Sequence, residues 1–175
     1  MEKNLIKTLK ILKNKKKKIV LCHGVFDLVH LGHIEHFKSA KSYGDYLIVS
    51  LTLDKFIKKG PGRPLFNEKQ RMEYLKQIKI VDQVILSKTE SSIDIINTIK
   101  PDFYVKGPDY KENYKDKTKK IILEKKAVEK NGGKIRFTND ITFSSSNILN
   151  TSNLIFDDKK RNFINNLKKK FTYNQ

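Results

Sequence analysis

The sequence has a single cysteine and no apolar run long enough to cross a membrane. Cys22 alone excludes an internal disulfide and is typical of a protein from a reducing compartment. A membrane span needs about 20 predominantly apolar residues, and charged residues interrupt each apolar segment here well before that length. Lysines recur through the first residues, which is not the pattern of a secretory signal. We therefore expect a cytoplasmic protein without a membrane span.

Arginine is also scarce, although the chain is strongly basic. Only four of its 37 basic residues are arginines, and with 19 acidic residues the net charge is +18. A charge of this size favours a nucleic-acid or acidic-membrane partner, but surfaces that read bases depend on the bidentate arginine fork. The joint abundance of Lys, Asn and Ile is typical of AT-rich coding. We therefore expect no nucleic-acid partner, while the basic surface would attract anionic substrates.

The apolar pattern divides the 175 residues into alternating helices and strands of one domain. Asn67 followed by Gln70 resembles a capping box, and the Gly/Pro-rich segment 58–64 indicates a loop. Apolar strands separated by helices predict an α/β, Rossmann-like three-layer fold with a five-stranded parallel sheet covered on both faces. Helices are expected over residues 3–14, 31–43, 67–78, 91–99 and 118–130 and from 145 onward, and strands over 19–22, 45–51, 82–86, 102–106 and 135–138.

The densest group of candidate catalytic residues follows the first strand. Ligands of such sheets bind beyond the carboxyl ends of the strands, where the strand order reverses. Gly24 permits a tight turn there. His30 and His33 lie three apart at a predicted helix start and so share one face, with Gly32 between them. A helix N-terminus already attracts anions, and two added imidazoles would stabilise a phosphate that gains negative charge.

These residues resemble a known family. His30-Leu31-Gly32-His33 matches the HxGH motif of the cytidylyltransferase-like nucleotidyltransferases, and Gly24-Val25-Phe26-Asp27 matches the G-x-F-D segment of the same family. The resemblance covers about residues 19–150. It divides the chain into an N-terminal amphipathic helix with a lysine-rich hinge (1–18), a nucleotidyltransferase domain (19–150) and a C-terminal helical tail (151–175).

Further matches follow in the family's order. Asp54 resembles its acidic residue after the second strand, and Lys55, Lys58 and Lys59 fall on its lysine-bearing loop over the triphosphate. Gln70-Arg71 resembles a pair whose arginine reaches phosphate, and Ser144-Ser145-Ser146-Asn147-Ile148 resembles a second phosphate-binding helix start.

The resemblance implies that a substrate phosphate attacks the α-phosphorus of a nucleoside triphosphate in line and releases pyrophosphate. Magnesium would arrive with the nucleotide, and we expect no metal site made by the protein alone. The implied catalytic residues are His30, His33, Lys58 and Arg71; the nucleotide-binding residues are Gly24, Val25, Phe26, Gly32, Lys59, Lys106, Gly107, Ser144, Ser145 and Ser146; and the substrate-binding residues are Asp27, Asp54, Asp109 and Tyr110. His23, His36 and Cys22 are interpreted as structural.

The substrates are less strongly indicated than the reaction. Residues 105–110 resemble the VKGxDY segment of heptose-phosphate adenylyltransferases, with Pro108 as the one departure. Glycerol-phosphate cytidylyltransferases carry R-T-x-G-I-S-T-T, whose arginine and glycine are missing from residues 139–146. We therefore favour ATP and a sugar phosphate, giving a heptose-like activated sugar for cell-surface polysaccharide. CTP, a polyol phosphate and a CDP-glycerol product stay open.

Two further hypotheses concern partners. A homodimer is expected, since relatives commonly dimerise, with Leu5, Leu9 and Phe163 as candidate contacts. The alternative from another class is a non-catalytic module whose basic surface binds nucleic acid or an anionic membrane. Salt-sensitive binding without nucleotide turnover would favour that module.

Overall fold

The computed structural model describes residues 2–59, 63–89, 91–108, 110 and 120–140, which belong to one compact unit spanning 1–142. The predictions for Asp109, Ser144, Ser145 and Ser146 and for the C-terminal helices lie outside the described residues. No helix in the described part of the chain combines the length and the apolar character that a membrane crossing requires.

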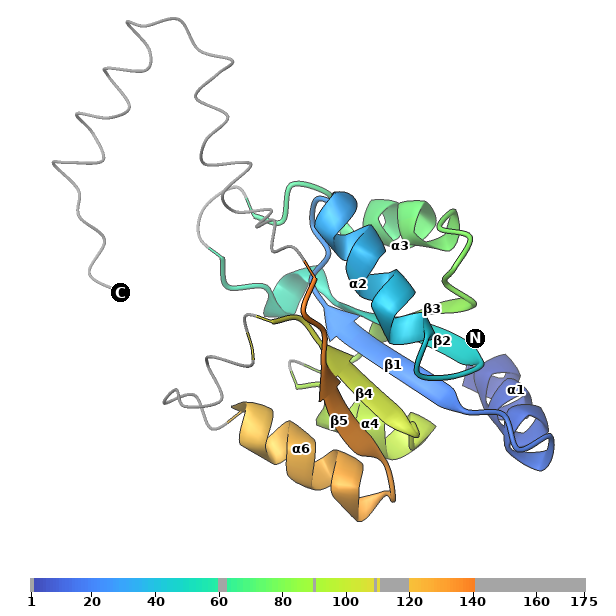
Figure 1. The fold of residues 1–175 in the computed structure, drawn as a ribbon. Helices are drawn as coiled ribbons and strands as arrows, with labels where there is room; N and C mark the ends of the chain where they lie inside the picture. Colours follow the sequence, from blue (N-terminus) through green and yellow to red (C-terminus); the bar gives the residue numbers. More distant parts are fainter. Residues whose placement is uncertain (1, 60–62, 90, 109, 111–119, 141–175) are drawn as a thin grey trace, which may run out of the picture. The chain divides into compact units, whose positions relative to one another are not determined.

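A parallel sheet of five strands forms the centre of this unit (Figure 1). The strand order is β3-β2-β1-β4-β5, so the first strand is the middle one and the order reverses between β1 and β4. This confirms the predicted fold class and places the ligand-binding crevice expected for such sheets beyond the carboxyl ends of β1 and β4. The strands are β1 (Ile19–Gly24), β2 (Tyr46–Thr52), β3 (Gln83–Ser87), β4 (Phe103–Lys106) and β5 (Lys134–Phe137).

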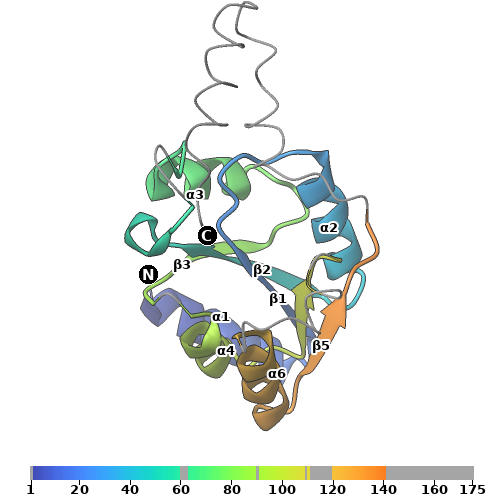
Figure 2. The same ribbon diagram turned by 90° about the vertical axis from the view of Figure 1, so that its left-hand side faces the viewer.

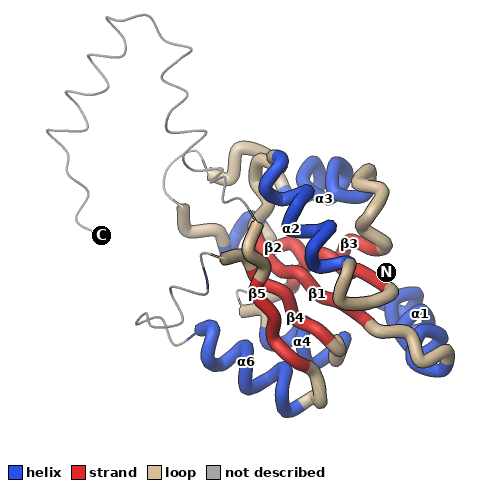
Figure 3. Tube along the Cα trace, in the orientation of Figure 1, coloured by secondary structure: helices blue, strands red, loops and turns tan. Residues whose placement is uncertain are grey.

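Helices cover both faces of the sheet, as Figure 2 shows. The first face is covered by α2 (Leu31–Lys41) and α3 (Glu68–Lys76). The other face is covered by α1 (Glu2–Asn14), α4 (Ile93–Ile99) and α6 (Lys120–Lys130). Figure 3 shows the alternation of helices and strands along the chain. A short 3-10 helix that the sequence pattern did not predict, η1 (Asp54–Phe56), follows β2.

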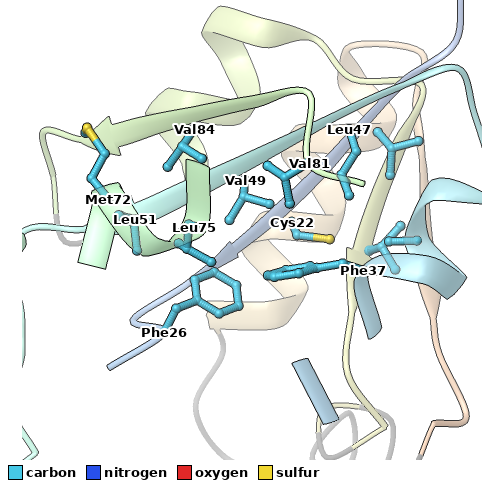
Figure 4. Close-up of a cluster of buried hydrophobic side chains, with 13 residues drawn as sticks. Cys22, Phe26, Phe37, Leu47, Val49, Leu51, Met72, Leu75, Val81 and Val84 are labelled. Carbon is cyan, nitrogen blue, oxygen red and sulfur yellow. The ribbon is translucent and has the colours of Figure 1, made fainter. Parts of the chain in front are cut away.

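The two faces are filled by alternate residues of the same strands, because successive side chains of a strand point to opposite sides. In β1, Val20 and Cys22 pack with the α2 and α3 residues, whereas Ile19 and Leu21 pack with α1, α4 and α6. Cys22 lies in the first of these cores (Figure 4). It is fully buried, and burial raises the pKa of its thiol, so it packs as a small apolar residue.

Helix α1 is part of this core. Leu5 and Leu9 are both only 6% exposed and pack with Ile19 and Leu21. The prediction that these two leucines form a dimer contact was therefore wrong, because the apolar stripe of the helix packs within its own chain. The homodimer itself stays a prediction. Phe163, the third candidate contact, lies outside the described residues.

The capping box before α3 is confirmed. Asn67 Oδ1 accepts hydrogen bonds from the backbone N–H of Lys69 at 3.1 Å and of Gln70 at 3.0 Å, and Gln70 Oε1 accepts from the backbone N–H of Asn67 at 3.1 Å. Because the capping box fixes where α3 begins, local sequence also sets the position of Arg71, which directly follows Gln70.

Candidate active site

The loop between β1 and α2 has a constrained backbone. Phe26 has a φ of +49°, a left-handed conformation that bulky residues rarely adopt. Its buried ring packs against His33, with ring centroids 5.3 Å apart, and against Phe37 at 5.2 Å. A Cβ on Gly24 would lie 3.1 Å from the Phe26 ring, so any larger residue would require the ring to shift by a few tenths of an ångström. The buried ring thus holds both the loop and His33.

The two histidines of the HxGH motif are brought together at the start of α2. His30 is the N-cap residue, and its backbone N–H donates to His33 Nδ1 at 3.4 Å. The two rings stack with centroids 3.9 Å apart and an interplanar angle of 26°. Gly32 between them is buried. The stacked pair lies at a helix N-terminus, where partial positive charge and free N–H groups favour an anion.

Both imidazoles are neutral near pH 7. Burial, followed by the nearby His30, His36 and Lys59, lowers the pKa of His33 to about 3. Burial also lowers the pKa of His30. Neutral imidazoles can donate an N–H to a phosphate oxygen without first paying the desolvation cost of a buried cation.

The lowered pKa values of the buried histidines predict that the fold loses stability in acid. Burial lowers the pKa of His36 to about 4 and that of His23 to about 3. An unfolded histidine has a pKa of about 6.5, so below that pH the unfolded chain binds more protons than the folded one. The free energy of unfolding should therefore fall as the pH is lowered from 7 to 5. Urea titrations at these two pH values measure this change.

Proton NMR of the imidazole Hε1 atoms provides the direct check. The signals of His23, His33 and His36 should not titrate above pH 5, and a His36→Asn variant should show a shallower pH dependence of stability than the natural chain. Signals that titrate with midpoints near 6.5 would contradict the assignment of neutral, buried imidazoles.

A cavity of about 380 Å³ opens at the carboxyl ends of β1, β2 and β4. This volume is within the usual range for small-molecule sites, about 300 to 1,000 Å³. Lysines Lys58, Lys59, Lys106 and Lys120 line it. Lys59 is near enough to His33 to lower the pKa of that imidazole, although neither His30 nor His33 is among the described lining residues. The described lining of the cavity comprises His23, Gly24, Val25, Thr52, Phe56, Ile57, Lys58, Lys59, Lys106, Tyr110, Lys120, Ile121 and Glu124.

Asp27 differs from its predicted role. Its side chain is 1% exposed, Oδ2 accepts from Arg63 Nε at 2.6 Å, and Oδ1 accepts from the backbone N–H of Leu65 at 2.7 Å and of Phe66 at 3.1 Å. The carboxylate therefore ties the segment around Arg63 to the β1–α2 loop. Loss of hydration and the charge of Arg63 lower the pKa of the neighbouring Lys59.

Arg71 is the main correction to the predicted site. Its side chain is fully buried and its guanidinium donates to the backbone carbonyls of Val25, Phe66 and Thr52 and to Asp54 Oδ1 at 2.6 Å. Its N–H groups are therefore engaged within the fold, and a triphosphate contact would require several of these bonds to break. Arg71 joins the ends of β1 and β2 to α3 as a positioning residue.

Asp54 also serves this junction. Its second oxygen, Oδ2, accepts from the backbone N–H of Glu68 at 3.1 Å, and Glu68 Oε2 accepts in return from the backbone N–H of Asp54 at 2.9 Å. Asp54 thus connects η1 with the start of α3, and its substrate contact stays a prediction.

The described part of the VKGxDY segment lies at the cavity. Lys106 ends β4, is 4% exposed, and its Nζ lies 3.4 Å from Glu124 Oε2 and 4.5 Å from the centre of the Tyr110 ring. Burial lowers the pKa of Lys106, but Tyr104 and Glu124 raise it to a net value above the ordinary one, so the ammonium is charged. Gly107 follows the strand, and a Cβ there would meet no described atom within 4 Å.

Sequence reasoning missed several residues of the cavity. His23 had been interpreted as structural, yet it lines the cavity with Nδ1 3.1 Å from Ser50 Oγ and Nε2 3.4 Å from Thr52 Oγ1. The available signal was polar residues at the carboxyl ends of otherwise apolar strands. For Glu124, the signal was one acid on the apolar face of its helix, next to Ile121 and Val128.

The described residues do not form a protein-only metal site. Within the ranges that the structure describes, no three His, Cys, Asp or Glu side chains are grouped so that they could hold a metal ion. The arrival of magnesium as part of the nucleotide substrate stays a prediction.

Comparison with known proteins agrees with this geometry. Residues 21–164 match the cytidylyltransferase-like family. The chain is 32% identical over 137 residues to the bifunctional protein HldE of Syntrophotalea carbinolica, covering 77% of this chain and 26% of that protein. It is 44% identical over 106 residues to HldE of Campylobacter jejuni subsp. doylei, covering 59% and 23%. The chain thus spans about a quarter of the length of these relatives.

Solved structures show the same fold. A lipopolysaccharide core biosynthesis protein from Thermoplasma volcanium is 26% identical, with a TM-score of 0.57 over 73% of this chain and 99% of that chain. A pantoate-beta-alanine ligase from Francisella tularensis is 19% identical, with a TM-score of 0.52 over 87% and 78%, and shows the fold alone. On the family match and the HxGH pair at the start of α2, the chain belongs to the cytidylyltransferase-like family of nucleotidyltransferases.

Proposed function

We propose that this enzyme transfers AMP from ATP to the phosphate group of a sugar phosphate and releases pyrophosphate. The observation that carries the proposal is the cavity with four lysines at the carboxyl edge of the sheet, together with the stacked His30–His33 pair at the start of α2, the helix that follows β1. A site of this charge suits two polyanionic substrates. The resemblance to heptose-phosphate adenylyltransferases at residues 105–110 supports the choice of a sugar phosphate.

The reaction proceeds by a direct displacement. An oxygen of the acceptor phosphate forms a bond to the α-phosphorus as the bond from that phosphorus to the α,β-bridging oxygen breaks, and pyrophosphate leaves with the electron pair. The protein's task is to position the two phosphates and to neutralise the developing charge. His30 and His33 donate neutral N–H groups to phosphate oxygens, and Lys58 and Lys59 attract the triphosphate from the cavity rim.

The remaining residues hold the catalytic groups and the loops in place. Phe26 holds His33, and Gly24 leaves room for the Phe26 ring. Asp27 and Arg71 tie the β1–α2 loop to the segments that follow β2. No protein nucleophile is needed, which agrees with a fully buried Cys22. Magnesium enters as the complex with ATP, and we assign it to the substrate.

The names of the relatives support a product for cell-surface polysaccharide. One solved relative is a lipopolysaccharide core biosynthesis protein, and HldE proteins are matched at 32% and 44% identity. A sugar activated by AMP would serve such a pathway. The competing product, CDP-glycerol, is disfavoured by the missing arginine and glycine in residues 139–146.

A substrate panel tests the proposal. Pyrophosphate release is measured with magnesium and either ATP or CTP, each offered with a heptose phosphate, a hexose phosphate or glycerol 3-phosphate. We expect release with ATP and a sugar phosphate. Release only with CTP and glycerol 3-phosphate would replace the proposal with the cytidylyltransferase alternative.

Calorimetric titration with each nucleotide completes this test. An enzyme that binds neither nucleotide yet binds nucleic acid or anionic vesicles, with an affinity that falls steeply with salt, would be the non-catalytic basic module instead.

A further inference from the structure

We propose that Glu124 and Lys106 form a specificity pair that recognises adjacent hydroxyl groups of a polyhydroxylated acceptor in the cavity. This inference rests on the proposed function and adds to it the chemical class that the site selects: a phosphorylated acceptor with two adjacent hydroxyl groups, in preference to one whose hydroxyl groups are not adjacent. The argument starts from how the pair is built.

Glu124 is an unusual residue for its position. Of the described residues that line the cavity, only Glu124 has a carboxylate, among four lysines. It lies on the inner face of α6 and is only 9% exposed. A carboxylate in such a place costs stability unless it is paired and hydrogen-bonded. The fold supplies those partners.

Three donors surround the carboxylate. Ser92 Oγ donates to Glu124 Oε1 at 2.5 Å, the Tyr104 hydroxyl lies 3.1 Å from Oε2, and Lys106 Nζ lies 3.4 Å from the same oxygen. Ser92 and Tyr104 are fully buried or nearly so. These contacts fix the carboxylate in one orientation on elements of the scaffold, which is the condition for precise recognition of a ligand.

Both partners retain hydrogen-bonding capacity. A carboxylate offers about four acceptor positions and an ammonium three donors. The Tyr104 hydroxyl has one proton and lies 3.1 Å from both Ser92 Oγ and Glu124 Oε2. It can donate to only one of these two oxygens at a time, which leaves acceptor capacity on Glu124. Glu124 and Lys106 both line the cavity.

The remaining capacity matches a diol. One hydroxyl of a vicinal pair can donate to the carboxylate while the other accepts from the ammonium. A phosphate alone would find only repulsion at Glu124, and it fits instead the lysines of the rim, Lys58, Lys59 and Lys120. The cavity therefore offers separate places for the charged end and the hydroxylated body of one acceptor.

The alternative is an ion pair that merely joins α6 to β4. The recognition role and the purely structural role predict different effects of a Glu124→Gln variant on the affinities of the two probe ligands. Glutamine keeps the size and an oxygen acceptor for Ser92 but removes the charge. Binding is measured by calorimetry with a non-hydrolysable ATP analogue present. The probes are a heptose phosphate and glycerol 2-phosphate, whose two hydroxyl groups are not adjacent. Glu129→Gln, an exposed position on the same helix, is the matched control.

We expect Glu124→Gln to raise the dissociation constant of the heptose phosphate about tenfold, the usual scale for a lost hydrogen bond to a charged group. The affinities for glycerol 2-phosphate and for the ATP analogue should stay as in the natural chain, and Glu129→Gln should change none of them. Equal losses for both acceptors, or no loss for the heptose phosphate, would overturn the inference. A comparable loss for the ATP analogue would also overturn it, because the ribose of ATP carries two adjacent hydroxyl groups as well.

A substitute variant and one further outcome cover the cases in which the first experiment cannot be interpreted. If Glu124→Gln does not fold, Tyr104→Phe replaces it: this change deletes only the hydroxyl that helps to orient the carboxylate, and the same selective weakening is expected. If the natural chain binds ATP but no sugar phosphate in the panel, the proposed function itself fails, and this inference fails with it.

Discussion

Replacement of His33 by alanine is expected to lower kcat about 100-fold while the protein stays folded. The imidazole lies at the N-terminus of α2, stacked on His30 and held by the Phe26 ring, so it is positioned before any substrate arrives. In the proposed reaction, its N–H stabilises charge that grows on the phosphate oxygens as the acceptor attacks. Because this interaction strengthens in the transition state, the change should appear in kcat more than in KM.

The control for this experiment is Glu35→Gln, which removes a charge from the same helix at a partly exposed position paired with Lys38. It should leave kcat and KM unchanged. Steady-state kinetics of pyrophosphate release and the circular dichroism of both variants provide the measurements. A His33→Ala enzyme with the kcat of the natural chain would show that the histidine pair is not the catalytic group.

The second large effect is expected at Arg71. Changing it to alanine should reduce the free energy of unfolding by about 3–5 kcal/mol, the scale for removing one partner of a buried ion pair. The guanidinium is fully buried, and its loss would leave Asp54 and the carbonyls of Val25 and Thr52 without their donor. Urea denaturation, with Lys69→Ala on the exposed side of α3 as the control, measures this change.

This prediction separates a positioning role from a phosphate-binding role. If Arg71 held the triphosphate, alanine would weaken nucleotide binding or lower kcat while stability stayed close to that of the natural chain. If Arg71 is structural, the main effect of alanine is a lower free energy of unfolding, and the kcat of the molecules that remain folded changes much less. An Arg71→Ala protein with unaltered stability and lost activity would restore the assignment made from sequence.

The success of sequence reasoning at β1 and its failure at Arg71 have different physical origins. The start of α2 and its two histidines depend on neighbouring residues, so the HxGH spacing was sufficient to predict a shared face. The location of the candidate residues beyond the carboxyl end of the first strand followed from the general rule for parallel sheets. The contacts of Arg71, in contrast, come from Val25, Thr52 and Asp54, which only the tertiary fold brings together.

The cavity residues show the same contrast between features set by local sequence and contacts set by the tertiary fold. Lysines 58 and 59 were predicted because they share a motif with the family, whereas Glu124 is separated by 18 residues from Lys106, its ion-pair partner. Its presence on an apolar helix face was a visible irregularity, but the sequence alone does not say which strand that face covers. A local motif identifies the chemistry of this site, and the long-range packing decides which neighbours complete it.

The most direct test of nucleotidyl transfer is phosphorus NMR of a reaction mixture that contains the protein, magnesium, ATP and a heptose phosphate. Our account predicts that the triphosphate signals and the sugar monophosphate signal decline together, while pyrophosphate and the paired signals of an AMP–sugar diphosphate linkage appear in equal amounts. Formation of ADP with inorganic phosphate, or persistence of the sugar monophosphate signal while ATP is consumed, would contradict it.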